Sequence, residues 1–215
     1  MSLLCKQREL NGKDYKSDVA VLCTDFFAKL CEEWKKFEPS EDAPLTCEYD
    51  ALTYQCPDDW LLYASGDKPG WGKCWTSVQY LLVLCTVDGH WILCQVDLLN
   101  QKVGIYDPLY KISKIANRRK QIAPLLNFIP AILQCSGYFQ QKGIPPKGSK
   151  FTIQHSIPPK KLPAQLDDDS CGVFICRYVD MLMRIKCFWG WGTKNVPQLR
   201  KEMALGIFAN SVPVE

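Results

Sequence analysis

The chain has 215 residues, of which 47% are hydrophobic and 23% are charged. A chain of this length can bury roughly 70% of its unfolded surface without the help of disulfides or metals, and the composition excludes disorder and fibrous repeats. The net charge of +3 gives no strong electrostatic case for nucleic acid as a partner.

The N-terminal part of the chain predicts one amphipathic helix over residues 18–37, with Ser17 or Asp18 as its N-cap. Its apolar side chains recur every three or four positions, at Val19, Leu22, Phe26, Leu30 and Trp34. Acidic residues and prolines over 38–58 then indicate a loop. A second loop is expected at Asp67–Lys73, which holds two glycines and a proline.

Three short runs rich in Val, Ile, Leu and Tyr follow, at Gln79–Val87, His90–Leu98 and Lys102–Asp107. Asp88-Gly89, between the first two runs, is a typical two-residue hairpin signal. Together they predict three consecutive antiparallel strands.

The second half of the chain is expected to alternate helices with one loop and one strand. Pro124 and Pro130 interrupt a helical pattern over 112–134, so we expect a broken or kinked helix there. A loop over 137–150, a strand over 151–157, and helices over 171–183 and 198–209 are predicted after it. The order of these elements predicts an α+β fold with a central, mainly antiparallel sheet flanked by helices.

The twelve cysteines and two histidines are the most unusual counts. No two cysteines have the Cys-x-x-Cys spacing, and so few histidines leave the chain without the usual pattern of a zinc site. We therefore expect no metal, no cofactor and no disulfide framework, with most cysteines reduced and packed as small hydrophobic residues. Residues 1–10 carry no secretory signal. The longest apolar stretch, over 125–133, is interrupted by Asn127 and Pro130, so no membrane span is expected.

His90 begins the second predicted strand, and a histidine base needs a carboxylate or amide that fixes its tautomer. Opposing residues of an antiparallel pair have numbers with a constant sum, and the turn after Leu98 sets that sum near 197 to 199. For either odd sum, Asp107 lies opposite His90 or diagonally across from it on the same face. An even sum would put the two side chains on opposite faces.

Asp97 is a poorer partner, because it lies on the other face of the same strand and roughly 23 Å from His90. From the hairpin alone, a structural role for His90, satisfied by a backbone carbonyl, is an equally good explanation. His155 lies on a strand pattern without a carboxylate at a comparable spacing, and we interpret it as structural.

Cys171 stands at a predicted junction between a loop and a helix. A thiol there is close to the helix N-terminus, which favours the thiolate, and its own N–H can point at a developing oxyanion. Gln165 can supply a side-chain amide as a second donor, and Gly172 lets a substrate backbone come close. The acidic run Asp167–Asp169 is expected to face solvent or to cap the helix, and Cys176 is expected in the core. Asp-Ser-Cys-Gly alone is a weak signal, but the chain order His, Asp, Gln, Cys strengthens it.

Three motifs resemble the ubiquitin-like-protein-specific (SUMO/sentrin-specific) cysteine proteases: Gly-His-Trp at 89–91, Ile-Tyr-Asp-Pro-Leu at 105–109, and Gln165-x5-Cys171-Gly172-Val-Phe. The resemblance is closest to the plant forms, including those carried by Mutator-like transposons. It extends from about Tyr63 to the C-terminus and implies an adenain/SUMO-protease-like fold.

This resemblance implies a chemical reaction, namely hydrolysis of a peptide or isopeptide bond after the Gly-Gly tail of a ubiquitin-like modifier, through a thioester. The implied partners are SUMO or a related modifier and its conjugates. The implied roles are Cys171 as nucleophile, His90 as general base, Asp107 as its orienting carboxylate, Gln165 as oxyanion-hole donor, Trp91 as the cover of the channel for the glycine tail, and Gly172 as a second substrate-binding residue.

Two features depart from the family pattern. Ser170 stands where family members often carry Asp, and the Trp-Leu element usual near the start of the domain has no clear counterpart. We therefore expect a single catalytic domain over 1–215, of which about residues 1–60 are diverged or truncated.

Two other functions stay open: a decayed, transposon-derived domain that binds a modifier without cleaving it, and a deconjugase of another ubiquitin-like modifier. The family implies a location in the nucleus or cytoplasm, and we expect a monomer. The basic run Lys114–Lys120 is interpreted as a solvated helix face.

Overall fold

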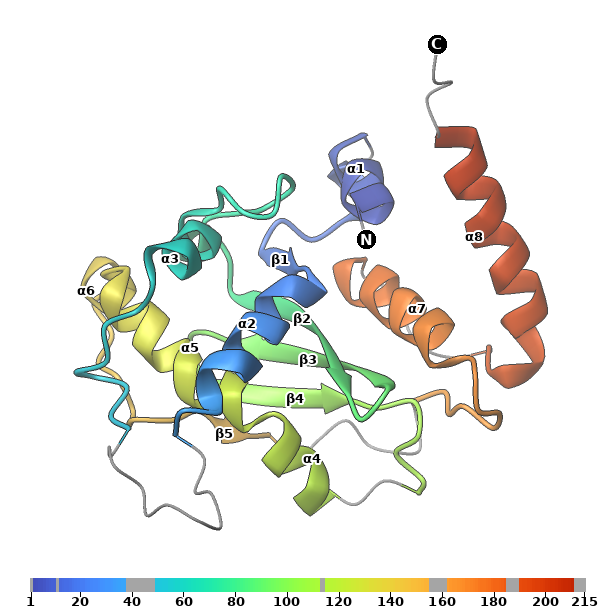
Figure 1. Cartoon of the computed structure of the whole chain (residues 1–215). Coiled ribbons are helices and arrows are strands. Elements are labelled where there is room, and N and C mark those ends of the chain that lie inside the picture. Colours follow the sequence, from blue (N-terminus) through green and yellow to red (C-terminus); the bar gives the residue numbers. More distant parts are fainter. Residues whose placement is uncertain are drawn as a thin grey trace.

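A five-stranded sheet lies at the centre of the computed structural model, which describes residues 2–10, 12–37, 49–112, 115–154, 162–184 and 190–210 (Figure 1). The strands lie side by side in chain order: β1 (Val19–Leu22), β2 (Tyr80–Val87), β3 (His90–Asp97), β4 (Lys102–Tyr106) and β5 (Thr152–Ile153). The two long central pairings are antiparallel, and the short outer pairings, β1 with β2 and β4 with β5, are parallel. The predicted α+β class with a central sheet is confirmed.

The β2–β3 hairpin closes through the predicted Asp88-Gly89 turn, in which both residues have positive φ, 48° and 73°. Glycine at the second position accepts this backbone conformation without steric strain, and the turn matches the twist of the strands that it joins. The next pairing sets Leu93 opposite Tyr106 and Asp97 opposite Lys102, so that paired numbers add up to 199. This is one of the two odd sums that the sequence predicts.

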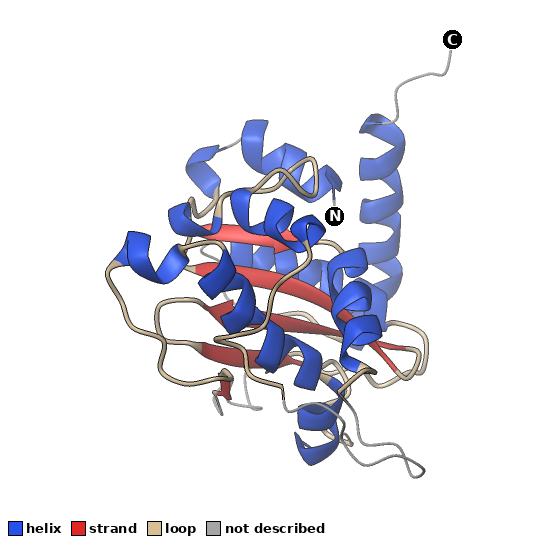
Figure 2. Ribbon diagram, turned by 60° about the vertical axis from the view of Figure 1, so that its left-hand side comes forward, coloured by secondary structure: helices blue, strands red, loops and turns tan. Residues whose placement is uncertain are grey.

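Helices cover both faces of the sheet, as Figure 2 shows. One face packs against α2 (Thr24–Trp34), α3 (Asp58–Ser65), α5 (Ala123–Cys135) and α6 (Tyr138–Lys142); the other packs against α7 (Cys171–Met183), with α1 (Ser2–Leu10) and α8 (Val196–Asn210) outside it. A short helix, α4 (Ile115–Gln121), precedes α5, and single 3-10 turns lie at Gly12–Asp14, Trp75–Ser77 and Thr193–Asn195.

Alternating side chains of the sheet feed two hydrophobic cores. In β2, Leu81 and Val83 pack on the side of α2 and α5, whereas Leu82 and Leu84 pack on the side of α7. Because successive strand residues point to opposite faces, a central strand covered on both sides must be apolar at nearly every position. The continuous apolar run of β2 follows from this arrangement.

The helix predicted over 18–37 is wrong in its first part. Val19–Leu22 is the edge strand β1, paired in parallel with β2, and the helix α2 begins only at Thr24 with Cys23 as its N-cap. All four residues of β1 are buried, because the strand is covered on both faces. An apolar run of this kind fits a buried strand as well as a helix face. Here the segment forms a strand because it pairs with the edge of the sheet at β2.

Several predicted boundaries are also corrected. Of the loop predicted over 38–58, residues 38–48 lie outside the described residues, and α3 begins at Asp58 with two acidic residues in its first turn, a favourable place for negative charge. The loop predicted over 137–150 contains the short helix α6. The strand predicted over 151–157 is present as β5 at two residues, and 155–157 lie outside the described residues. The helix over 171–183 is confirmed, and α8 extends the one predicted over 198–209.

The broken helix predicted over 112–134 is confirmed, and its two prolines have different consequences. The break between α4 and α5 falls at Ile122, so Pro124 lies in the first turn of α5, where a missing N–H costs nothing. Pro130 lies inside α5 and has no N–H for the carbonyl of Leu126, four residues earlier. That carbonyl instead accepts the N–H of Phe151 at 2.8 Å, which ties the chain before β5 to the helix.

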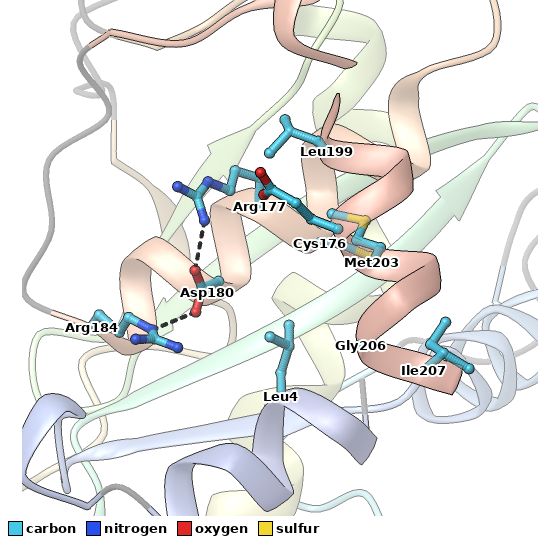
Figure 3. Close-up of a pocket in the computed structure, with 10 residues that line it drawn as sticks. Leu4, Cys176, Arg177, Asp180, Arg184, Leu199, Met203, Gly206 and Ile207 are labelled. Atoms are coloured by element: carbon cyan, nitrogen blue, oxygen red, sulfur yellow. Dashed lines mark hydrogen bonds and ion pairs between the residues drawn. The ribbon is translucent and has the colours of Figure 1, made fainter. Parts of the chain in front are cut away.

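The C-terminal end of α7 is held by charged and backbone contacts to the N-terminal segment. Asp180 accepts hydrogen bonds from Arg177 at 3.0 Å and from Arg184 at 2.6 Å (Figure 3). Arg184 also donates to the hydroxyl of Tyr15, and the N–H of Lys16 donates to the carbonyl of Met183 at 2.8 Å. The first residues of the chain therefore fix one end of the helix that begins with Cys171.

A cavity of about 310 Å³ lies beside these contacts, between α1, α7 and α8. Figure 3 shows Leu4 of α1 on one side and Leu199, Met203 and Ile207 of α8 on the other.

Among the helices that the structure describes, none combines the length and the apolar character that a membrane crossing requires. The ten cysteines in the described ranges are free thiols, and four of them, Cys171 included, are buried.

We predict that Phe128→Ala lowers the free energy of unfolding by about 3–5 kcal/mol, because the side chain is fully buried and its removal leaves a cavity. Its ring lies within 6.1 Å of five aromatic rings, those of Trp34, Phe37, Tyr49, Tyr54 and Trp60. Urea unfolding followed by tryptophan fluorescence measures the loss. Phe208→Ala, at a side chain that is 80% exposed, is the matched control and should change stability by less than about 0.5 kcal/mol. Equal effects of the two changes would contradict this packing.

Candidate active site

His90 and Asp107 meet at one end of the sheet. His90 is the first residue of β3, Asp107 directly follows β4, and His90 Nε2 lies 2.8 Å from Asp107 Oδ1. In the observed register Asp107 is diagonally across from His90, so the geometric prediction from the hairpin is confirmed. Because an ionised carboxylate only accepts hydrogen bonds, Nε2 of His90 carries the proton and Nδ1 is left as the acceptor.

The carboxylate of Asp107 is 4% exposed and is surrounded by donors. Besides His90, the N–H of Leu109 donates to Oδ1 at 2.8 Å, and Arg118 Nε donates to Oδ2 at 2.7 Å. Burial by itself would raise the pKa of Asp107. The hydrogen bonds from His90, Arg118 and Leu109, together with the charge of Arg118, outweigh burial and lower the pKa to about 2. Asp107 is therefore ionised at neutral pH.

The other candidate carboxylate, Asp97, is the last residue of β3, at the opposite end of the strand from His90. Asp97 accepts hydrogen bonds from the backbone and side chain of Asn100 at 3.0 and 2.9 Å, and so stabilises the turn between β3 and β4. His155 lies outside the described residues.

Cys171 is the first residue of α7, and its side chain is 9% exposed. A helix of 13 residues begins at this position, so the thiol lies where the helix dipole favours negative charge. The turn in front of it is organised by Asp167, whose Oδ1 accepts the N–H of Ser170 at 2.9 Å and that of Asp169 at 3.3 Å. Burial would raise the pKa of Asp167, but these hydrogen bonds lower it. As predicted, Asp168 and Asp169 face solvent; Asp167 bonds the turn before the helix, and α7 has no side-chain cap hydrogen bond at its N-cap Ser170.

Gln165 is buried beside the His90–Asp107 pair. Its N–H donates to the carbonyl of Pro108, the residue after Asp107, at 2.9 Å. Its Nε2 donates to the carbonyl of Asp167 at 2.7 Å and contacts Oδ1 of the same residue at 3.2 Å. Its Oε1 is buried without a hydrogen-bond partner among the described residues. Donation to an oxyanion would require this amide to turn away from Asp167.

These contacts form a continuous connection from Asp107 through Pro108, Gln165 and Asp167 to Ser170, the residue before Cys171. Figure 1 shows the same arrangement at the level of the elements. The first turn of α7 lies at the end of the sheet where β4 finishes and β2 turns into β3.

The two predicted substrate-binding residues flank this region. Trp91 follows His90 in β3, is half-buried and packs against the core on the α7 side of the sheet. A Cβ placed on Gly172 would meet no heavy atom within 4 Å, apart from its chain neighbours and its own helix. Neither packing nor a positive φ therefore demands glycine at this position, and the space in front of it is open.

Comparison with known proteins identifies the family. The sequence model of the Ulp1 protease family, C-terminal catalytic domain, matches residues 2–212. The chain belongs to this family. It is thus a member of a family of cysteine peptidases, with nearly its whole length in the catalytic domain.

Two solved structures with similar folds come from the same family. The SUMO protease Ulp1 with its catalytic cysteine oxidized to a sulfonic acid superimposes with a TM-score of 0.58 at 12% identity, covering 96% of this chain and 75% of that one. The Ulp1-like SUMO protease catalytic domain of Chaetomium thermophilum gives a TM-score of 0.55 at 11% identity, covering 97% of this chain and 68% of that one. At these identities, the likeness concerns the fold.

Arg118 is a site residue that the sequence does not reveal, and the interpretation of Lys114–Lys120 as a solvated face is wrong at this position. Arg118 is 9% exposed and bonded to Asp107, whereas Arg119 and Lys120 beside it are exposed. A run of basic residues carries no signal that tells which one turns inward, because that depends on the rotation of α4 against the sheet.

Within the described ranges, no group of three or more His, Cys, Asp or Glu side chains could hold a metal ion.

We predict that Asp107 makes the protein sensitive to acid. Since its pKa is about 2 in the folded protein and 3.8 ordinarily, it stabilises the fold above pH 3.8, and this contribution of about 2 kcal/mol is lost as the pH falls through 2. The stability difference between wild type and Asp107→Asn should therefore shrink over this range in urea unfolding. Asp168→Asn, at an exposed carboxylate, is the control. A difference that stays constant from pH 5 to pH 2 would contradict the assignment.

Proposed function

We propose that this protein is a thiol protease that hydrolyses the peptide or isopeptide bond after the Gly-Gly tail of SUMO or a related ubiquitin-like modifier. The observation that carries the proposal is the 2.8 Å contact between His90 and Asp107 in a chain of the Ulp1 family. Cys171 at the head of α7 and Gln165 beside Pro108 supply the remaining groups that thioester chemistry requires.

The reaction follows from these groups. His90 Nδ1 takes the proton of the Cys171 thiol, and the thiolate attacks the carbonyl carbon of the last glycine. The N–H of Cys171 and the turned amide of Gln165 hold the oxyanion. The carbon–nitrogen bond then breaks, and the amine leaves with the proton from His90. Water, deprotonated by His90, hydrolyses the thioester and restores the thiol.

Asp107 supports both proton transfers without taking part in them. As a carboxylate bonded to Nε2, it keeps Nδ1 free as the base and stabilises the imidazolium that forms. Its depressed pKa means that it stays charged while His90 gains and loses a proton. The orientation of the base is thus independent of pH over the neutral range.

Specificity for a glycine tail is expected from Trp91 and Gly172. An indole that covers a narrow channel admits a backbone without side chains and excludes others by steric clash. The open space at Gly172 supports this proposal, because the fold does not itself require glycine there.

The biological setting is proposed on the family and the motifs. We place the protein among the plant and transposon-associated members of the family, in the nucleus or cytoplasm, acting as a monomer on SUMO or a related modifier and its conjugates.

We predict that Cys171→Ala abolishes hydrolysis of a SUMO fusion and prevents labelling by a SUMO probe with a C-terminal vinyl sulfone. The variant should still bind SUMO, because only the nucleophile is removed. Cys176→Ala is the matched control on the same helix and should keep activity and labelling; burial raises the pKa of the Cys176 thiol and makes it a poor nucleophile. A wild type that binds SUMO but forms no adduct would favour a binding domain. Labelling by another modifier's probe alone would favour the other deconjugase.

A second prediction concerns the glycine tail. A SUMO fusion ending in Gly-Ala should be cleaved at least about 100-fold more slowly than one ending in Gly-Gly, because a methyl group in a closed channel clashes with its walls. Comparison of kcat/KM for the two fusions measures this. The discrimination should weaken in Trp91→Ala, and equal rates for both fusions in the wild type would contradict the proposed channel.

A further inference from the structure

We propose that Arg118 is a positioning residue that holds Asp107 and, through Gln121, the turn in front of His90 in one rigid arrangement. The proposal rests on the proposed function of the site. It deepens that function by assigning a role to α4, a helix that contributes none of the reacting groups.

The contacts of Arg118 connect three parts of the chain. Its Nε donates to Asp107 Oδ2 at 2.7 Å, and its NH1 donates to Gln121 Oε1 at 2.8 Å. Gln121 in turn donates through Nε2 to the carboxylate of Asp88. Asp88 is in the β2–β3 turn, two residues before His90. Helix α4 thus contacts both Asp107 and the β2–β3 turn that leads into His90.

The geometry at Asp107 shows why this connection matters. Oδ1 accepts from both His90 and Leu109, and Oδ2 accepts from Arg118. With a donor on each oxygen, the carboxylate cannot rotate about its Cβ–Cγ bond without breaking a contact. Loss of the Arg118 contact would remove the restraint at Oδ2 and leave only the two contacts at Oδ1, so the plane of the carboxylate, and with it the position of His90 Nε2, would be less well defined. A misplaced base costs rate even when every reacting group is present.

Burial makes the contact strong. The side chains of Arg118 and Asp107 are only 11% and 5% exposed, so water competes little for either partner. The positive charge of Arg118 also compensates the negative charge of Asp107, and a buried carboxylate needs such a partner to remain ionised. Lysine is a poor substitute, since its single ammonium group cannot reproduce the fork by which guanidinium bonds Asp107 and Gln121 at once.

The first experiment compares Arg118→Met with Arg119→Met in the full chain. Both changes remove one positive charge from the same helix, but Arg119 is exposed. For cleavage of a SUMO fusion we expect Arg118→Met to lower kcat roughly 10- to 100-fold, less than the roughly 10⁴-fold loss known for replacing a triad's carboxylate by an amide. KM should change less than threefold, because Arg118 is buried and its guanidinium group is bonded to Asp107 and Gln121. Arg119→Met should keep kcat within twofold.

Two further variants separate positioning from general stability. Arg118→Ala should recover part of its kcat in methylguanidine, which can occupy the vacated place beside Asp107, and methylammonium should not replace it. Gln121→Ala keeps the contact to Asp107 and should lose less kcat than Arg118→Met. A lost kcat that no guanidinium compound restores, in a variant with wild-type urea unfolding, would overturn the proposal.

A readout without substrate keeps this proposal separate from the proposed function. The proton between His90 Nε2 and Asp107 should give a downfield proton NMR signal in the free wild type, retained in Arg119→Met and broadened or lost in Arg118→Met. Retention of the signal and of kcat in Arg118→Met would overturn the role of Arg118 while leaving the protease function intact. A wild type that shows the signal but cleaves nothing would overturn the protease function, and the signal would still decide the role of Arg118.

Discussion

The buried carboxylate of Asp107 stays ionised because donors from three parts of the chain converge on it. His90 reaches it across the register of β3 and β4, Leu109 through the turn after β4, and Arg118 from α4. An ionised carboxylate without such partners would be strongly destabilised by burial. The hairpin, the turn and α4 therefore depend on one another at this end of the sheet, and the orientation of His90 depends on all three.

The helix that carries Cys171 is held at both ends by residues distant in sequence. At its first turn, Asp167 joins the N–H of Ser170 to the amide of Gln165, and Gln165 is bonded to the strand end at Pro108. At its last turn, Asp180 and Arg184 are tied to the N-terminal segment at Tyr15. The thiol is thus placed relative to the sheet by contacts at both ends of α7.

Local patterns predict well where the interactions themselves are local. The Asp88-Gly89 turn fixes the β2–β3 hairpin, and the short connection to β4 allows few registers, so the meeting of His90 and Asp107 could be foreseen. The same approach fails at Val19–Leu22, where an apolar run fits a helix face and a buried strand equally well. It also could not foresee that the carbonyl freed by Pro130 would accept the N–H of Phe151.

By itself, the sequence determined the α+β class, the central hairpins and the helix that starts at Cys171, and it singled out Asp107 as the carboxylate that an odd register would bring to His90. These depend on periodicity, turn chemistry and helix ends, which act over a few residues. Only the tertiary structure decided that β1 joins the sheet, that Gln165 is bonded to Pro108 and Asp167, and that Arg118 turns inward to Asp107. Each of these depends on how one element is rotated or aligned against another, and that is set by the packing of the whole core.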